Sequence, residues 1–427
     1  MNQKLQALID FLDGSKSVFH AVDLLKKRLE GEGYCALSEG DKWNLQKGGK
    51  YYMTRGGAAL IAFRIPGEVP TGFMLSAAHC DRPTFKVKEN GVLSGTYTRL
   101  STEKYGGMLM APWLDRPLSV AGRAVVETEQ GVESRLIDID RDLLLIPNVA
   151  IHMNRKANDG YTYNPAVDTI PLMGGKDCAK QFEKLLEETA GGKVLGHDLT
   201  LYVRQKATVW GLNEEYISAA ALDDLQCVWC CTEGFVASAE SKAIPVLCVF
   251  DSEEVGSSSL QGADSNLLES VLERICAALD LPMAQLLSNA LLVSADNAHA
   301  VHPNHPEFAD SQNAPVVNGG VALKFNANQR YTTDGVSAAL WRKICQKADV
   351  PVQTYCNRAD IPGGSTLGNI SLNHVSVRSL DLGLPQLAMH SCYETAGVQD
   401  TLDFVKAMTV FYSSALRSSG DGVWELL

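Results

Sequence analysis

Two adjacent carboxylates, Glu253 and Glu254, follow an apolar run at positions 244–250. The run predicts a buried strand, and an ionised carboxylate at the end of such a strand is costly unless a cation or a proton compensates it. The pair suggests two roles, in which one carboxylate binds a metal and the other moves protons. On an extended chain adjacent side chains point opposite ways, so Glu254 would face a metal while Glu253 faces a water. The simpler alternative is a solvated loop that opens a helix.

Other residues that can bind a metal also stand at the ends of predicted strands. Each of them follows an apolar or strand-like run: His79, Asp223, Asp296 and His390. An α/β fold gathers the carboxyl ends of its strands along one edge, where ligands bind. Imidazoles and carboxylates suit Zn²⁺, Mn²⁺ or Co²⁺. Taken singly, such a His is more often structural and such an Asp more often caps a helix, but together the positions predict a metal site.

The pattern of elements supports this placement. Residues up to about 80 indicate two helices, a hairpin and a strand, and from about 206 onward strands alternate with helices. Alternation of this kind predicts an α/β fold with a mostly parallel sheet and helices on both faces. Between them, residues 84–205 contain many short β-like runs. We therefore expect an inserted, mostly β domain at 84–205 that splits the first domain into residues 1–83 and 206–427.

Particular elements follow from the same patterns. Helices are predicted at 267–279, 335–348 and 401–416, and strands at 244–250 and 352–356. Apolar residues at helical spacing support the helices, and short apolar runs support the strands.

Composition narrows the class of protein. The 427 residues include 38 Lys and Arg against 50 Asp and Glu, a formal net charge of -12. A nucleic-acid partner would favour a basic surface, so none is expected. No apolar run approaches the ~20 residues of a membrane span, and no secretory signal is evident, so we expect a cytoplasmic protein without a membrane partner.

The eleven cysteines are scattered through apolar runs. Cys227 and Cys230 have the CxxC spacing, but no second pair completes a zinc site. We expect reduced thiols that pack in the core.

Several of these segments resemble one family in order along the chain. They are SAAHCDRP at 76–83, LDDL at 222–225, FDSEEVGSS at 250–258, SADNAHAVHPN at 294–304, NANQRY at 326–331 and MHS at 389–391. Together they resemble the aspartyl aminopeptidase family of dinuclear zinc metalloaminopeptidases. The resemblance covers essentially the whole chain and implies a fold like that of the zinc exopeptidases.

The resemblance implies a role for each candidate ligand. His79 and Asp296 would bind one metal ion, Glu254 and His390 would bind a second, and Asp223 would bridge the two. Zinc is the expected metal, with manganese or cobalt as alternatives.

It also implies the residues that act on the water and on the ligands. Glu253 would be the general base, and Asp81 would orient His79.

Substrate recognition is also implied by the resemblance. Lys324, in the apolar run 321–325, would help to bind an acidic side chain, with Tyr331 and His299 nearby. The alternative is a lysine whose stem covers apolar surface while its head reaches water. His152 would reach the active site of a neighbouring subunit in a tetrahedral dodecamer, and the alternative is a solvated strand-end histidine.

His302 and His305 continue the three-residue spacing from His299. Pro303 and Pro306 break any helix at these positions. We therefore expect loop residues rather than a further set of ligands.

The expected function is metal-dependent hydrolysis of the N-terminal residue of peptides, with a preference for Asp or Glu. Three alternatives stay open. They are an aminopeptidase for neutral or other residues, an amidohydrolase of N-acyl amino acids, and a non-catalytic assembly protein with a vestigial metal site.

Overall fold

The computed structural model describes residues 2–176, 178–364 and 366–427. Within these ranges nine strands form the main sheet. In spatial order they are β1 (Cys35–Ala36), β2 (Lys50–Arg55), β3 (Ala59–Arg64), β13 (Ile244–Phe250), β4 (Phe73–His79), β14 (Leu291–Ala295), β18 (Arg378–Gly383), β16 (Val321–Phe325) and β17 (Val352–Cys356). The central strands β13, β4, β14 and β18 are parallel, so their carboxyl ends meet at one edge.

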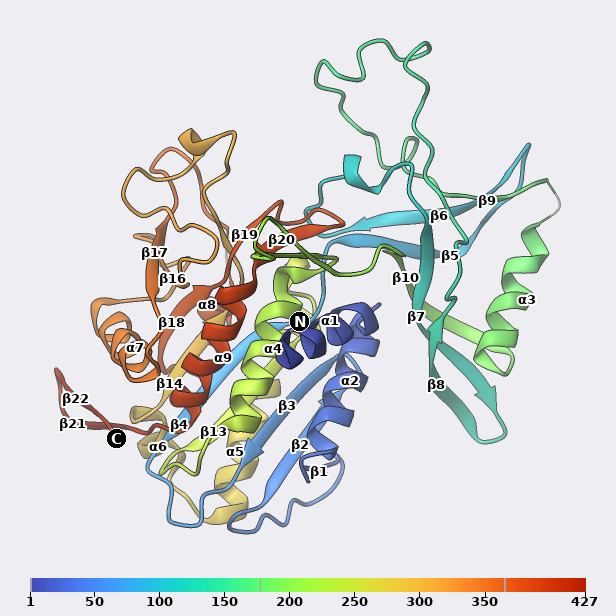
Figure 1. The fold of residues 1–427 in the computed structure, drawn as a ribbon. Helices are drawn as coiled ribbons and strands as arrows, with labels where there is room; N and C mark the ends of the chain where they lie inside the picture. Colours follow the sequence, from blue (N-terminus) through green and yellow to red (C-terminus); the bar gives the residue numbers. More distant parts are fainter. Residues whose placement is uncertain (1, 177, 365) are drawn as a thin grey trace.

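Two hydrophobic cores lie on opposite faces of the main sheet, because successive side chains of a strand point to opposite sides. In β4, Met74 and Ala78 join one core, and Phe73, Leu75 and Ala77 join the other. The first core contains α1 (Gln3–Gly14), α2 (Val18–Glu30), α4 (Leu222–Ala237), α7 (Gly335–Ala348) and α9 (Val398–Tyr412). The second contains α5 (Leu267–Leu279), α6 (Met283–Ser288) and α8 (Leu367–Ser371) (Figure 1). The predicted α/β fold class is confirmed.

The long periodic segments have the predicted bounds: the strands at 244–250 and 352–356 and the helices at 267–279 and 335–348. The predicted helix at 401–416 is wrong at both ends, because α9 begins at Val398. It stops at Tyr412, where Ser413 donates its hydroxyl hydrogen bond back to the carbonyl of Thr409. Leu416 begins β21 (Leu416–Gly420) instead, which pairs with β22 (Val423–Leu426).

The second sheet is built from strands that all lie between residues 84 and 203 of the described chain. Its order is β8 (Gly131–Asp138), β7 (Leu118–Thr128), β10 (Val194–Val203), β5 (Thr84–Leu93), β6 (Thr98–Tyr105) and β9 (Leu172–Gly174). Helix α3 (Ala179–Ala190) packs on this sheet through Phe182 and Leu186. We propose that residues 84–205 form an inserted domain.

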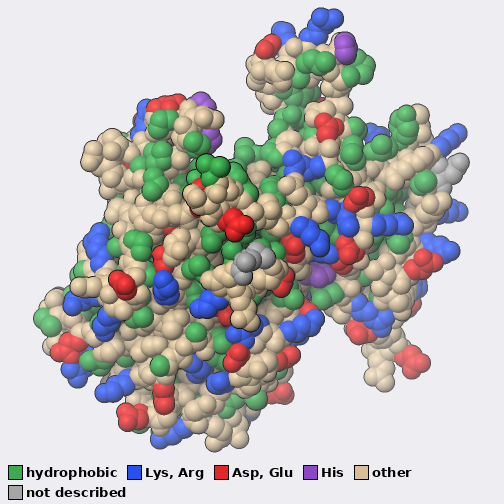
Figure 2. All heavy atoms as spheres, viewed as in Figure 1, with side chains coloured by type: hydrophobic (Ala, Val, Ile, Leu, Met, Phe, Trp, Pro, Cys, Tyr) green, Lys and Arg blue, Asp and Glu red, His purple; other side chains and the backbone are tan. Residues whose placement is uncertain are grey.

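The long segment between β8 and β9 projects from the second sheet, at the top of Figure 1. It exposes apolar side chains, including Val149 (51%), Ile151 (48%) and Met153 (79%). Figure 2 shows hydrophobic atoms over the same projection. These side chains make the segment a candidate surface of interaction.

A third sheet lies beside the carboxyl edge of the main sheet. It consists of β11 (Thr208–Trp210), β12 (Tyr216–Ala219), β20 (Glu394–Gly397), β19 (Pro385–Leu387) and β15 (Ala298–His299). Short 3-10 turns, η1 (Ala111–Trp113), η2 (Glu253–Val255) and η3 (Pro306–Phe308), connect other elements of the described chain.

Cys227 and Cys230 are buried in α4, and each cysteine that the structure describes is free. The predicted core role of the CxxC pair agrees with this. Among the described residues, no helix combines the length and the apolar character needed to cross a membrane.

Candidate metal centre

The main sheet positions the candidate ligands of its own carboxyl edge. His79 is the last residue of β4 and pairs in register with Phe250, the last residue of β13. The turn that holds Glu253 and Glu254 therefore begins beside His79. Asp296 follows β14 directly, and its backbone N–H donates to the β18 strand at Leu382 O, 2.9 Å away.

The third sheet delivers the other candidate ligands. Asp223 follows β12, and His390 follows β19. Glu394, the first residue of β20, fixes both of them. One of its carboxylate oxygens accepts from the Asp223 N–H at 3.0 Å, and the other accepts from the His390 N–H at 2.7 Å. The prediction that all ligands occupy strand ends of one sheet is therefore wrong for these two residues, because an adjoining sheet brings them to the edge.

The five side chains form two groups that share one carboxylate. In each group the potential ligand atoms lie within 4.8 Å of one another: His79, Asp223 and Asp296 in one, and Asp223, Glu254 and His390 in the other. Asp223 Oδ1 lies 3.5 Å from His79 Nε2, and Oδ2 lies 3.4 Å from His390 Nε2. The two oxygens of Asp223 thus face different groups.

This set of donors fits a pair of divalent cations. Asp223 Oδ1 and Glu254 Oε1 are buried and have no hydrogen-bond partner, an arrangement that is costly unless a cation is bound. Imidazole nitrogens and carboxylate oxygens are ordinary zinc ligands. His390 is the most exposed of the five residues, with 34% of its side chain accessible. Solvent therefore reaches the centre beside His390.

The metal-free carboxyl groups favour protons. Burial raises the pKa of Glu254 to about 11, and the charge of Asp223 adds to the effect. Burial also raises the pKa of Asp296 to about 6, despite the opposing charge of Lys324. Burial acts in the same direction on Asp223, but the imidazoles of His390 and His79 hold its pKa below the usual range.

We expect metal affinity to increase with pH near neutrality. At pH 7 the Glu254 carboxyl, with a pKa of about 11, carries a proton that a cation must displace. Each released proton makes the apparent affinity rise about tenfold per pH unit. His79 adds to the slope, because burial lowers its pKa but Asp223 and Asp81 raise it well above the usual value. Competition with a chromophoric chelator at pH 6.5 and 7.5 measures this slope. The variant Glu254→Gln has no such proton and should show a shallower slope, whereas a flat response in the unaltered protein would contradict the prediction.

Asp81 organises the turn beside His79. Its Oδ1 accepts from the Glu253 N–H at 3.1 Å and lies 3.3 Å from His79 Nδ1, and its Oδ2 accepts from the Glu254 N–H at 3.1 Å. Glu253 and Glu254 belong to the 3-10 turn η2, so the predicted extended geometry at these residues is wrong. Asp81, rather than strand alternation, determines how the two side chains diverge.

Glu253 lies against the same acidic set. Burial raises its pKa to about 8, and the charges of Asp296, Asp81 and Asp223 contribute while His79 opposes them. A carboxylate in such a place can accept a proton at neutral pH.

Lys324 is buried beside the first group, with 3% of its surface exposed. Its Nζ lies 3.6 Å from Asp296 Oδ2 and 5.4 Å from the centre of the Tyr331 ring. The Tyr355 ring lies 6.3 Å from that of Tyr331 and 6.1 Å from that of His299. The alternative in which the lysine head reaches water is therefore wrong. We call Lys324, Tyr331, Tyr355 and His299 the Lys324 cluster.

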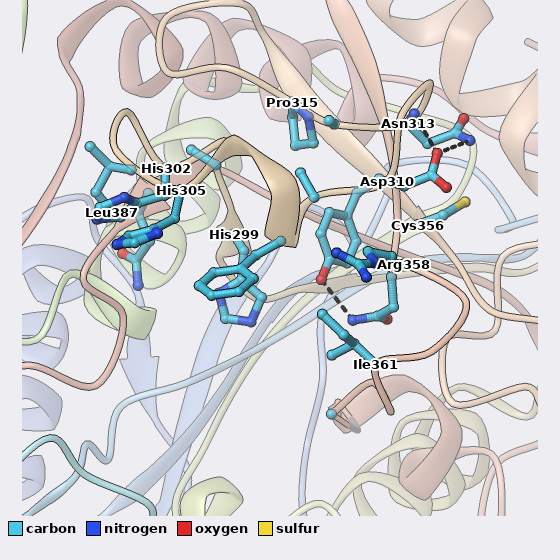
Figure 3. Close-up of a pocket in the computed structure, with 18 of the residues that line it drawn as sticks. His299, His302, His305, Asp310, Asn313, Pro315, Cys356, Arg358, Ile361 and Leu387 are labelled. Atoms are coloured by element: carbon cyan, nitrogen blue, oxygen red, sulfur yellow. Dashed lines mark hydrogen bonds between the residues drawn. The ribbon is translucent and has the colours of Figure 1, made fainter. Parts of the chain in front are cut away.

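A cavity of about 390 Å³ opens beside the Lys324 cluster. Figure 3 shows His299 in the middle of it, with His302 and His305 near Leu387 at one end and Asp310 at the other. His302 and His305 pair as an isolated bridge and belong to no helix. The prediction of loop residues at these two positions is confirmed.

His152 is exposed on the segment between β8 and β9 and lies outside both groups of ligands. Sequence reasoning also missed residues that the structure places at the centre. They include Glu394, Tyr355, and Tyr105, whose hydroxyl donates to Asp81 Oδ2 at 2.7 Å. Each is a single residue in a strand or at its end, without a motif of spacing, so no sequence signal separates it from a residue of the core.

Comparison with known proteins places the chain in one family. The family model for the aminopeptidase I zinc metalloproteases (M18) matches residues 11–412. A probable M18 family aminopeptidase 2 of Clostridium novyi is 44% identical over 422 residues, which cover 95% of this chain and 98% of that protein.

Solved structures agree. The structure described as the Ape4 and Nbr1 complex has a TM-score of 0.93 and 34% identity, covering 96% of this chain and 85% of the matched one. The mApe1 dodecamer of S. cerevisiae has a TM-score of 0.84 and 27% identity, with 95% of each chain covered. The chain therefore belongs to the M18 family of aminopeptidases, a family of zinc metalloproteases.

Proposed function

We propose that this aminopeptidase uses two divalent cations, with zinc as the expected metal, and prefers peptides that begin with Asp or Glu. The shared Asp223 carboxylate carries the proposal, because its oxygens face His79 and His390 separately. His79 and Asp296 would hold one cation, and Glu254 and His390 the other. When bound, such a pair supplies Lewis acidity that polarises the scissile carbonyl and acidifies a water.

The chain's own groups supply the proton transfers. Glu253 takes a proton from the attacking water and later passes it to the leaving amine. Burial raises its pKa to about 8 in the metal-free chain, and two bound cations would lower this pKa, so that the carboxylate is ionised and can accept the proton of the water. Asp81 keeps Nε2 of the imidazole free to bind the cation, because its backbone carbonyl lies 3.1 Å and its carboxylate Oδ1 3.3 Å from His79 Nδ1.

A panel of substrates tests this function. Aminoacyl p-nitroanilides of Asp, Glu, Leu and Lys should be cleaved fastest for the acidic residues, and activity should be lost to a chelator and restored by zinc, manganese or cobalt. N-acetylated versions should resist cleavage. Cleavage of blocked substrates alone would favour an amidohydrolase, and metal-loaded protein inert to every free-amine peptide would favour a non-catalytic role.

The acidic preference rests on the Lys324 cluster. Lys324 is a buried cation beside Asp296, and burial opposes its charge while Asp296 and Tyr331 raise its pKa above the usual range. His299 and Tyr331 stand beside it. A buried ammonium that keeps its charge favours a substrate carboxylate over a neutral side chain.

Replacing Lys324 with Met is therefore expected to lower the ratio of kcat/KM for Asp over Leu substrates by roughly 10- to 150-fold, the value of a hydrogen bond to a charged group. The ratio isolates recognition of the substrate side chain. Any effect of the substitution on Asp296 changes kcat/KM for both substrates alike. Lys343→Met, at an exposed position of α7, is the control and should leave the ratio unchanged. An unchanged ratio in Lys324→Met would remove Lys324 from substrate binding.

We further propose that the chain forms a homo-oligomer, a dodecamer like that of the yeast relative, in which His152 reaches the site of a neighbouring subunit. The exposed apolar residues of the segment between β8 and β9 support this, because they need a covering partner. His152 lies within that segment.

Subunit mixing tests the role of His152. The variants His152→Ala and Glu253→Gln should each have low activity as pure oligomers. In a mixed oligomer a Glu253→Gln subunit can lend its His152 to a neighbour whose own Glu253 is intact, so activity should reappear after dissociation and reassembly together. Mixing without any recovery, in oligomers shown by mass to be mixed, would contradict a shared site.

A further inference from the structure

Tyr105 joins the second sheet to the candidate catalytic turn. It is the last residue of β6 and pairs with Thr84, the first residue of β5. Its hydroxyl donates to Asp81 Oδ2 at 2.7 Å. Figure 1 shows β5 and β6 extending from the second sheet toward β19 and β20. A side chain of the proposed inserted domain thus reaches the main sheet's carboxyl edge.

Among the described residues, few hydrogen-bond donors contact the Asp81 carboxylate. The carboxylate is 1% exposed, so water does not replace a missing partner freely. Its other contacts are the Glu253 and Glu254 N–H groups, each at 3.1 Å, and His79 Nδ1 at 3.3 Å. Tyr105 is therefore the hydrogen-bond donor to this carboxylate that comes from outside the turn and its neighbouring strand.

The residues after Tyr105 continue across the second group of ligands. At Gly106, with φ of +74°, an added Cβ would lie 3.1 Å from Glu254 Cβ, so the backbone passes close to that side chain. Leu109 donates its N–H to the carbonyl of His390 at 3.0 Å. The segment 105–109 therefore touches Asp81, Glu254 and His390 in turn.

We propose that Tyr105 is a positioning residue through which the second sheet fixes the orientation of Asp81 and, through it, the turn that carries Glu253 and Glu254. The proposal rests on the roles proposed above for those carboxylates. It adds that the inserted region does more than cover the site or contact other subunits, because it holds one of the carboxylates on which the geometry of the turn depends.

The variant Tyr105→Phe removes the hydroxyl and keeps the ring. We expect kcat to fall about 10-fold, the lower end of the value of a hydrogen bond to a charged group, because Tyr105 acts indirectly; KM and metal content should stay unchanged. The visible absorption bands of the Co²⁺-substituted protein should also shift, because Glu254 changes its orientation. Tyr202→Phe is the matched control. Tyr202 also lies in the second sheet, and its hydroxyl donates to Asp138 Oδ1 at 2.8 Å.

A second comparison tests whether Tyr105 acts through Asp81. On an Asp81→Asn background, Tyr105→Phe should cost little more, because the two residues form one unit. Three results would each overturn the proposal. They are full additivity of the two substitutions, an unchanged kcat and Co²⁺ spectrum in Tyr105→Phe, and an equal loss of kcat in Tyr202→Phe. If the unaltered protein cleaved no free-amine peptide, the proposed function would fall, and the Co²⁺ spectra would still decide whether Tyr105 positions the turn.

Discussion

Replacing Glu253 with Gln is expected to reduce kcat by roughly 10²- to 10⁴-fold, the usual contribution of a general base. Gln keeps the size of the side chain and the backbone N–H that donates to Asp81 at 3.1 Å. It cannot accept a proton from water. Metal content and KM should therefore stay close to those of the unaltered protein, and steady-state kinetics with metal analysis of the same samples measures all three.

The control for this variant lies in the same loop. Asp264 accepts from the Ser258 hydroxyl at 2.9 Å and is remote from both groups of ligands. Asp264→Asn should leave kcat near its original value, which separates loss of the base from disturbance of the loop. Normal turnover by a fully metal-loaded Glu253→Gln protein would show that another group is the base.

Asp223→Ala is expected to have the larger effect, because it removes the one ligand that both groups share. Metal content should fall from about two equivalents to near zero. Activity should fall by at least roughly 10⁴-fold, part of the 10⁶-fold or greater acceleration that enzymes typically provide. Elemental analysis after dialysis against zinc gives the first quantity, and hydrolysis of the preferred p-nitroanilide gives the second.

Glu254→Gln is the graded comparison for Asp223→Ala. It changes one group and leaves His79, Asp223 and Asp296 together. It should therefore retain about one equivalent of metal. If Asp223→Ala also retained one tightly bound equivalent, the two groups would be independent and the shared-ligand arrangement would be wrong. Circular dichroism of both variants establishes that they are folded.

The sequence predicted helices and strands well where a regular pattern of apolar residues extended over many positions. The buried strand at 244–250 and the helices at 267–279 and 335–348 have the expected bounds because their apolar patterns end at polar or breaker residues. The helix predicted to reach 416 was too long. Apolar residues near its end belong to the C-terminal hairpin instead, and a local pattern does not distinguish the two uses.

The candidate centre was predictable in part for a physical reason. His79 and Asp296 lie at the carboxyl ends of neighbouring parallel strands, as the general rule for α/β sheets requires. Asp223 and His390 arrive through the third sheet. There β20 pairs with β19 next to it in sequence, Ala396 with Gln386, and also with the distant β12, Gly397 with Tyr216, and no local pattern reports the second pairing.

The residues that support the ligands were hidden for another reason. Glu394 and Tyr105 act through hydrogen bonds to a backbone N–H or a carboxylate. Such roles depend on a distance of about 3 Å between atoms, and a sequence carries no record of that distance.

The ligands of the two groups are spread along nearly the whole chain, from His79 to His390. During synthesis His79 is made before the other four ligands, and His390 is made after them. The group of Asp223, Glu254 and His390 is incomplete until the residues after β19 have been made, whereas His79, Asp223 and Asp296 are all present earlier. We therefore expect the two groups to acquire their cations at different times, with the group that contains His390 loaded last.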